Sequence, residues 1–440
     1  MKYNSIIIGG GLAGLTSAIR CAEAGLKTAL ISAGDSALTF ASGSIDVLGF
    51  RQNNALVDYP FEAISQLPDG HPYRKLGADQ VRQSLNFFTG QMAQAGIEMS
   101  CHGQQNHSRL TALGAMRPAW LSQPGAKPLS LAEPAAGLRR VAIINIAGCR
   151  DFQPALLAAG LKKHTDFAGV ELTIGDIRAD TISLTARNVY ELRSLEIARL
   201  LKRDLFSRPE GLTTLASAIN KAAGNADLVV LPSVLAVENG NQLIHQLEAH
   251  TGLRLCELAT LPPSLPGMRM ASALRQRYRQ LGGLLLEGDE VVSGNFDNDR
   301  LLSITTRLNP SMPLTADHFV LATGSFFSRG LDSNPSSLTD KTFNLDVVTA
   351  GQRQHWSNQH FLNGSQHPFC YFGIETNDHF NPYQEGQVIG NLYCAGAVLG
   401  GFNPVAEASA GGVAISTGWL AAKQITAQYS DVRGNHVESH

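Results

Sequence analysis

Three glycines at the spacing Gly9-x-Gly11-x-x-Gly14 form the pattern in this chain that points most directly to chemistry. A short β-branched run, Ser5–Ile8, precedes them, and a helical pattern, Leu15–Ala24, follows them. In such a turn the first glycine permits the tight bend, the second lets the backbone approach a phosphate, and the third lets helix and strand pack closely. The helix N-terminus adds N–H groups that attract an anion. We therefore predict a nucleotide phosphate at this turn.

The end of the next strand decides which nucleotide is bound. A ribose-binding carboxylate is expected about 20 residues after the glycine turn. The strand Lys27–Ser32 ends in an uncharged residue, and Asp35, which lies 21 residues past Gly14, follows a turn-forming Ala33-Gly34 pair. Asp35 either binds a ribose or stabilises its own turn through side-chain to backbone hydrogen bonds. Ser32 at the strand end favours a mononucleotide over an adenine dinucleotide.

Small hydroxyl residues and a glycine occur in the segment directly after the strand Lys27–Ser32. They suit the close approach of a flat ligand, whereas a plain polar loop is the alternative interpretation. The residues that we predict to contact a cofactor here are Ser32, Ser36, Ser42, Gly43 and Ser44.

Two later glycine motifs have similar surroundings. Thr323 and Gly324 directly follow the apolar strand Phe319–Leu321. Gly396 and Gly401 follow another strand in "NLYCAGAVLGGFNP", which leads into a small-residue helix predicted for Glu407 to about Thr426. Such helices allow close backbone approach to a flat ligand, although tight core packing explains the same composition. We predict that these glycines meet the first turn around one cofactor.

The composition excludes several classes of function. The 440 residues are 44% hydrophobic and 16% charged, and the net charge of −2 gives no reason to expect nucleic acid as a partner. Six scattered cysteines without a C-x-x-C pair argue against a disulfide framework, a zinc site or an iron–sulfur site. Neither a signal peptide nor an apolar stretch of about 20 residues is visible, so we expect a soluble cytoplasmic chain.

The three motifs together resemble the two-domain flavoproteins of the fumarate reductase and glycerol-3-phosphate dehydrogenase type. A closer resemblance is to the B-subunit family of anaerobic glycerol-3-phosphate dehydrogenases, through the stretch "SALTFASGSID". "ELATLPPSLPGMR", "VLATGSFFSRGL" and "LYCAGAVLGGFNPV" extend this resemblance over most of the chain.

The resemblance implies an FMN-binding flavoprotein, with FAD as the alternative cofactor. It also implies two partners, an FAD-bearing A subunit and an iron–sulfur C subunit that docks the pair on the cytoplasmic face of the inner membrane. The assembly would oxidise sn-glycerol 3-phosphate to dihydroxyacetone phosphate and pass electrons to quinone. Two alternatives remain open: an electron-transfer or assembly subunit without its own substrate site, and a stand-alone FAD-dependent oxidoreductase.

The catalytic residues remain unassigned. Hydride transfer to a flavin needs mainly positioning and electrostatics. A phosphorylated substrate favours arginine, and alcohol oxidation favours a base such as histidine. The weak candidates near the expected domain junctions and between the later motifs are Arg269, Arg329, His360 and His367, and no metal site is expected.

We therefore predict an α/β fold with a Rossmann-like flavin-binding domain of discontinuous segments and an inserted α+β cap domain. Prolines at positions 60, 68 and 72 and the stretch "LATLPPSLPGMR" set the expected boundaries. The flavin-binding domain should comprise residues 1–60, 265–330 and 385–440, the cap or substrate domain residues 61–264, and a further cap or interface excursion residues 331–384.

Overall fold

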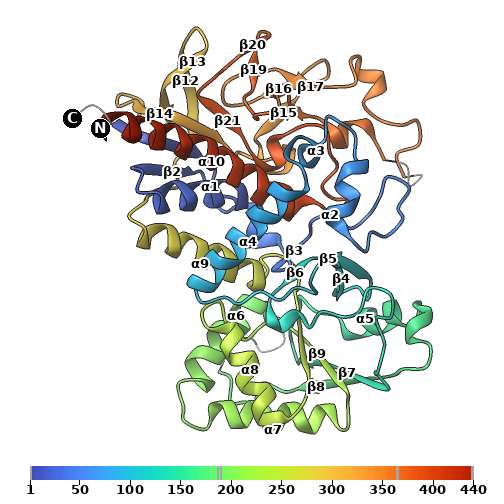
Figure 1. Cartoon of the computed structure of the whole chain (residues 1–440). Coiled ribbons are helices and arrows are strands. Elements are labelled where there is room, and N and C mark those ends of the chain that lie inside the picture. The colour runs from blue at the N-terminus through green and yellow to red at the C-terminus, as the bar shows by residue number, and fades with distance from the viewer. Residues whose placement is uncertain (1, 186–187, 189–190, 363–365, 438–440) are drawn as a thin grey trace. The chain divides into compact units, whose positions relative to one another are not determined.

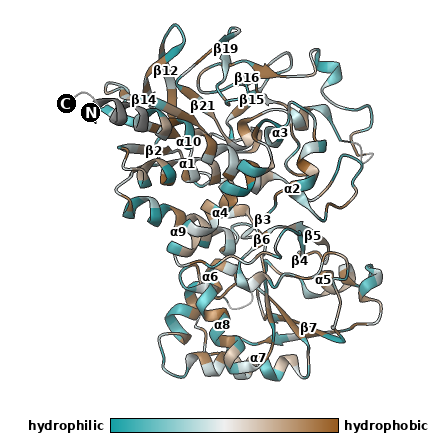
Figure 2. Cartoon of the chain, in the orientation of Figure 1, coloured by the Kyte–Doolittle hydropathy of each residue, from teal (hydrophilic) through white to brown (hydrophobic). Residues whose placement is uncertain are grey.

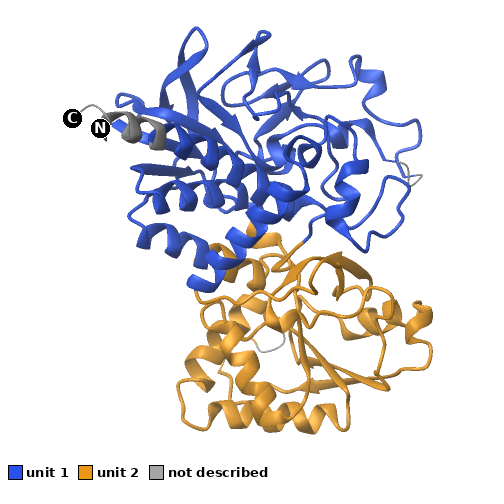
Figure 3. Ribbon diagram, viewed as in Figure 1, with its two compact units in different colours: residues 1–37, 46–95, 273–440 blue, residues 38–45, 96–272 orange. Residues whose placement is uncertain are grey.

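The chain folds into two compact units in a computed structural model that describes residues 2–185, 188, 191–362 and 366–437. Unit 1 comprises Met1–Ala37, Asp46–Ala95 and Ala273–His440, and unit 2 comprises Leu38–Ile45 and Gly96–Ser272 (Figure 3).

Unit 1 is built on a seven-stranded sheet in the order β11-β2-β1-β14-β13-β12, with β21 paired to β14 (Figure 1). β11, β2, β1, β14 and β21 run parallel, and β12 and β13 are antiparallel to their neighbours. β2 is buried throughout, as expected for a parallel strand covered on both faces. The strands are β1 (Lys2–Ile8), β2 (Thr28–Ser32), β11 (Leu284–Glu287), β12 (Val291–Asp297), β13 (Arg300–Thr306), β14 (Leu314–Leu321) and β21 (Leu392–Cys394).

Two helices of unit 1, α1 (Leu12–Glu23) and α10 (Ala410–Val437), pack against each other. A Cβ at Gly418 would lie 2.3 Å from the Ala13 carbonyl oxygen, so the small residues of α10 allow this close crossing. The remaining elements are α2 (Pro60–Ala63), α3 (Pro72–Leu76), α4 (Ala78–Gln94), and the pairs β15 (Leu331–Ser333) with β16 (Leu338–Asp340), β17 (Val347–Val348) with β18 (Gly373–Ile374), and β19 (Tyr383–Gln384) with β20 (Gln387–Val388). Helix α9 (Leu265–Gln280) contains the division between the units at residue 272.

Unit 2 contains a four-stranded parallel sheet in the order β10-β9-β7-β8. The hydrophobic colour of β7 in Figure 2 matches its burial in the middle of this sheet. The strands are β7 (Arg140–Ile146), β8 (Glu171–Ile177), β9 (Leu228–Pro232) and β10 (Leu255–Leu258). The helices are α5 (Pro154–Leu161), α6 (Ser194–Leu200) with a π-helical turn at Leu201–Leu205, α7 (Gly211–Ala223) and α8 (Gly240–Thr251). Antiparallel pairs join β3 (Ser44–Ile45) to β6 (Leu121–Ser122) and β4 (His107–Leu110) to β5 (Met116–Ala119).

Most predicted elements lie close to the observed ones. The first strand–turn–helix–strand unit is present as β1, α1 and β2. The sequence also predicts a strand over Arg140–Ile146, which coincides with β7. α10 begins at Ala410 rather than Glu407, because Glu407 lies in a loop that its side chain helps to fix. The sequence also predicts a helix over Val189–Leu205. The start of that range lies partly outside the described residues, and α6 starts at Ser194.

The predicted domain boundaries differ from the observed division. Residues 61–95, predicted to belong to the inserted domain, lie in unit 1, and so do residues 331–384. Pro60 and Pro72, predicted to mark a domain exit, instead each begin a helix, α2 and α3. Proline is favoured at the first helical position because its missing N–H would have no partner there. Prolines in a polar stretch therefore did not distinguish a linker from two short helices.

Unit 2 contains a buried ion pair between Arg269 on α9 and Glu257 on β10. Both side chains are almost fully buried, and two guanidinium nitrogens donate to the two carboxylate oxygens at 2.6 and 2.8 Å. The Arg269 Nε donates to the Ala236 carbonyl at 2.6 Å, and the Ser233 hydroxyl donates to Glu257 at 3.1 Å. These hydrogen bonds satisfy both charged groups. Because Arg269 lies on α9 and Glu257 on β10, the pair joins the helix to the parallel sheet of unit 2.

Replacing Arg269 with methionine should lower the free energy of unfolding by about 3–5 kcal/mol, because Glu257 would remain buried without a partner. The double variant Arg269→Met with Glu257→Gln should recover part of this loss. As a matched control, Arg178→Met removes the exposed pair with Asp180 and should leave the free energy of unfolding almost unchanged, because water screens exposed pairs. Urea unfolding measures all three, and equal effects for Arg269→Met and Arg178→Met would contradict the structural role.

Candidate functional site

Five parallel strands of unit 1 end side by side at one edge of the sheet. The register pairs Ile8 of β1 with Ile31 of β2 and with Leu321 of β14. At the same level Leu321 pairs with Cys394 of β21, and Ser32 pairs with Glu287 of β11. The three predicted glycine motifs follow β1, β14 and β21, so the structure brings their first residues to this edge. Nucleotide sites in open α/β sheets lie outside such carboxyl ends.

The glycine turn packs directly on its neighbours. Gly9 has φ of +116°, and an added Cβ would lie 2.2 Å from the Ala322 carbonyl oxygen. A Cβ at Gly14 would lie 1.9 Å from the Gly9 carbonyl oxygen, and one at Gly10 would lie 2.4 Å from the Ser32 hydroxyl oxygen. Contacts within the protein therefore account for these three glycines.

Gly11 is different, because the protein itself does not require a glycine there. Its φ of −83° suits any residue, and the nearest atom to an added Cβ is the Ser36 Cβ at an ordinary 3.9 Å. Gly11 is also the N-cap of α1 and has no side chain with which to accept a hydrogen bond from the first turn. An open position without a side chain at a helix N-terminus is what a phosphate group needs.

The N-terminus of α10 offers a contrast. The Asp46 carboxylate accepts a hydrogen bond from the Gly411 N–H at 2.8 Å, and the Asp46 carbonyl accepts one from the Gly412 N–H at 2.7 Å. A carboxylate thus already occupies the anion position at α10. Of the two helices, α1 is the better candidate for a phosphate.

The strand end after β2 carries no carboxylate. Ser32 is the last residue of β2, is buried, and donates its hydroxyl hydrogen to the Gly34 carbonyl at 2.9 Å. Asp35 follows a bend at Ala33-Gly34 and is exposed. The neighbouring strand β11 ends in Glu287, whose carboxylate pairs with Arg279 at 2.7 Å. The predicted strand end at Ser32 is therefore correct, and Asp35 lies outside the strand as expected.

The two later glycine motifs, after β14 and β21, contain tightly packed glycines and one buried hydroxyl without a hydrogen-bond partner among the described residues. The Thr323 hydroxyl is buried and has no hydrogen-bond partner among residues that the structure describes. Gly324, Gly396 and Gly401 all have positive φ, and an added Cβ would meet Ser328, Ala13 and the Gly70 carbonyl, respectively, within 2.8 Å. Packing therefore explains these glycines without a ligand, whereas the buried Thr323 hydroxyl still needs a partner beyond the residues that the structure describes.

Ser36 belongs to unit 1, whereas Ser42, Gly43 and Ser44 belong to unit 2. There Gly43 packs against Pro266 and Gln123, and the Ser44 hydroxyl lies 2.9 Å from the Ser122 hydroxyl. Ser122 in turn lies 2.7 Å from Nε2 of His107. Sequence reasoning missed both residues, because no local pattern around His107 indicates that its ring meets a strand 15 residues away.

Of the weak catalytic candidates, two are hydrogen-bonded to other protein groups and two are exposed to solvent. Arg269 is occupied by Glu257 and the Ala236 carbonyl. At His367, Nδ1 accepts a hydrogen bond from the Asn358 N–H at 3.0 Å, and Nε2 lies 2.9 Å from the Phe361 carbonyl. Since Nδ1 is an acceptor, Nε2 carries the hydrogen, and the ring is held as one neutral tautomer. Arg329 and His360 are exposed.

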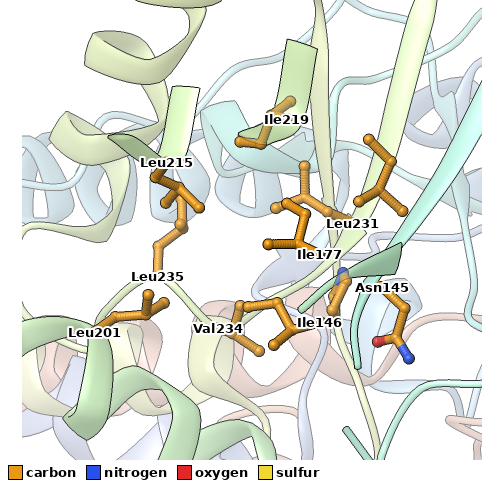
Figure 4. Close-up of a pocket in the computed structure, with 11 residues that line it drawn as sticks. Asn145, Ile146, Ile177, Leu201, Leu215, Ile219, Leu231, Val234 and Leu235 are labelled. Carbon is orange, nitrogen blue, oxygen red and sulfur yellow. The ribbon is translucent and has the colours of Figure 1, made fainter. Parts of the chain in front are cut away.

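One pocket lies in unit 2, at the carboxyl ends of β7, β8 and β9 (Figure 4). Its cavity volume is about 20 Å³, and its lining is aliphatic apart from Asn145 and Pro232. None of the predicted site residues lines it. Within the described ranges, no group of three or more histidine, cysteine, aspartate or glutamate side chains could hold a metal ion.

Comparison with known proteins gives the family. The chain matches the FAD binding domain family over residues 4–413. It is 42% identical to the B subunit of anaerobic glycerol-3-phosphate dehydrogenase from Vibrio vulnificus strain YJ016, with 96% of each chain covered. It is 40% identical to the protein of that name from Aliivibrio fischeri strain MJ11, with 97% of this chain and 96% of the relative covered. A solved structure, the 3-ketosteroid Δ1-dehydrogenase of Sterolibacterium denitrificans, is 13% identical with a TM-score of 0.44, covering 97% of this chain and 100% of that one.

The match to the family and the coverage of the relatives extend over nearly the whole chain. The Rossmann-like fold and the resemblance proposed from the sequence are confirmed. The chain belongs to the B-subunit family of anaerobic glycerol-3-phosphate dehydrogenases and is a flavoprotein subunit of the oxidoreductase class.

Proposed function

We propose that this chain binds FMN with its phosphate at the Gly11 turn and takes part in oxidising sn-glycerol 3-phosphate to dihydroxyacetone phosphate. The substrate is proposed because the relatives, which cover almost the full length of this chain, are named glycerol-3-phosphate dehydrogenase subunits. Gly11 is the single observation that carries the cofactor site. It is the one member of the turn for which neither backbone conformation nor packing requires glycine.

FMN rather than FAD is proposed from the end of β2. The adenosine ribose of a dinucleotide is usually held by a carboxylate at this position. Here the Ser32 hydroxyl bonds to the local backbone, and Glu287 on the adjacent strand is paired with Arg279. A phosphate site without the ribose anchor suits a mononucleotide, and FAD is the alternative outcome of a cofactor measurement.

The other predicted cofactor contacts have separate roles in this proposal. Gly9 and Gly14 shape the phosphate turn, and Thr323 offers a hydroxyl at the edge of the same sheet. Gly324, Gly396 and Gly401 keep the adjoining turns tight. For the segment from Ser42 to Ser44, which belongs to unit 2, a cofactor contact stays a prediction from the sequence. Once bound, the flavin supplies the acceptor for a hydride, and the protein supplies orientation and electrostatics.

The names of the relatives support a multi-subunit assembly. We propose an FAD-bearing A subunit and an iron–sulfur C subunit as partners, with quinone as the electron acceptor and docking at the cytoplasmic face of the inner membrane through the C subunit. In the part of the chain that the structure describes, no helix is both long and apolar enough to cross a bilayer.

The hydrogen bonds of two catalytic candidates favour a second role for this chain, as an electron-transfer subunit. Each of the three guanidinium nitrogens of Arg269 and both ring nitrogens of His367 already have a protein partner, which argues against a substrate contact by either residue. The chain would then relay electrons from the A subunit rather than oxidise glycerol 3-phosphate itself.

Gly11→Val should leave the chain folded but reduce the flavin that copurifies with it to a trace, because the side chain would fill the phosphate position. Flavin content per chain and circular dichroism measure the two effects. Gly90→Ala is the control, since a Cβ there meets nothing within 4 Å and α4 is remote in sequence from the turn. Stoichiometric flavin in Gly11→Val would contradict the proposed site.

The relay role predicts how the flavin of this chain becomes reduced. Glycerol 3-phosphate added anaerobically to the purified chain should leave its flavin oxidised, and addition of the A subunit should then bleach the visible flavin absorption. Bleaching by substrate with this chain alone would instead assign direct oxidation to it and exclude the relay role.

A further inference from the structure

Strand β8 forms one margin of the parallel sheet in unit 2. The sheet order β10-β9-β7-β8 leaves the outer side of β8 without a neighbouring strand among the described residues. All seven residues of β8 pair with β7 in one continuous parallel register. Glu171, Ile174 and Asp176 are exposed, and the exposed fraction of Ile174 in the middle of the strand is 52%. β8 is therefore a regular and accessible edge strand.

The hydrogen bonds to β7 show which backbone groups of β8 face outward. The Glu171 N–H donates to the Arg139 carbonyl at 2.9 Å, and the Ala147 N–H donates to the Ile177 carbonyl at 2.9 Å. Both ends of β8 thus direct their backbone groups toward β7, and successive residues of a strand alternate in this direction. The residues whose N–H and C=O groups face the open edge are therefore Leu172, Ile174 and Asp176.

The other edge strands of the two main sheets are protected against further pairing. Natural proteins block an edge by a short strand, an irregular register, or a lysine or proline in the strand. β10 and β11 have only four residues each. β12 has seven residues, but its register with β13 is interrupted at two places. β8, with the sequence "ELTIGDI", has none of these protections, so its edge is a template for another strand.

We propose that β8 pairs antiparallel with β8 of a second copy of this chain, about a two-fold axis at Ile174. Both copies offer the same edge, as an interface around a two-fold axis requires. An axis at Ile174 aligns the whole of both strands, because Glu171 and Ile177 lie equally far from it. Ile174 then lies opposite Ile174, and Leu172 lies opposite Asp176 of the other copy. Each of these pairs exchanges two backbone hydrogen bonds, since both members face the open edge.

The side chains of β8 fit this register. The exposed Ile174 side chains cover each other at the axis, and such cross-strand apolar pairs stabilise a sheet. Asp176 lies opposite Leu172 and Glu171 lies opposite Ile177, so no carboxylate faces another directly across the interface. The Arg140 guanidinium also donates to the Glu171 carboxylate at 2.8 and 2.9 Å within each copy. A strand from a different protein gains the same backbone hydrogen bonds, but this side-chain match favours a second copy.

Sedimentation equilibrium of the full-length chain tests the proposal at concentrations between about 1 and about 100 μM. The wild-type chain should form a dimer. Ile174→Lys places two ammonium groups opposite each other and should raise the dissociation constant by about 100-fold or more. Leu113→Lys is the matched control, since it adds the same charge at another exposed apolar residue of unit 2 and should leave the dimer intact. Circular dichroism checks that each variant is folded.

A mixture of two variants tests the two-fold register itself. Ile174→Glu alone should be as monomeric as Ile174→Lys, whereas an equimolar mixture of the two should associate, because unlike charges then meet at the axis. A mixture that associates no more strongly than either variant alone would overturn the proposal.

Three further outcomes would also overturn it: a monomeric wild-type chain, a dimeric Ile174→Lys, or a β8 edge that binds only a different subunit. The proposal is independent of the proposed cofactor, because β8 belongs to unit 2 and the glycine turn to unit 1. Flavin content therefore tests the proposed function, and association tests this interface.

Discussion

The close approach of Gly9 to the Ala322 carbonyl is the contact on which the candidate site depends. An added Cβ would lie 2.2 Å from that oxygen, so only glycine lets the turn after β1 pack against the end of β14. The Gly9 N–H also donates to the Ile31 carbonyl, and the Ala322 N–H donates to the Ile8 carbonyl. These contacts align three strand ends. Two residues later, Gly11 lies at the start of α1, where an added Cβ would make only an ordinary contact with the Ser36 Cβ at 3.9 Å.

Local patterns in the sequence were enough to predict the turn, because strand, glycines and helix follow one another within 20 residues. The end of β2 at Ser32 was predicted for the same reason. Long-range contacts could not be predicted. The polar segment around Pro60 and Pro72 resembled a linker, but its apolar side chains, such as Phe61 and Tyr73, are buried in unit 1.

The functional candidates show the same limit. Arg269 is a candidate for phosphate binding by its residue type and its place near a junction, yet Glu257, 12 residues earlier, occupies its guanidinium. His107 carried no motif at all, and its relation to Ser44 depends on three strands from separate stretches of chain. Residue type indicates which chemistry is possible, whereas the partners of each group decide whether it is available.

The central claim is that the glycine turn holds a flavin mononucleotide, and the most direct test is the mass of the released cofactor. The chain is purified under mild conditions, its flavin is released by acid or heat, and the flavin is identified by mass spectrometry. The account predicts FMN, in keeping with the absence of a carboxylate at the end of β2. Recovery of FAD would contradict it and would mean that Asp35 or another group holds the adenosine ribose.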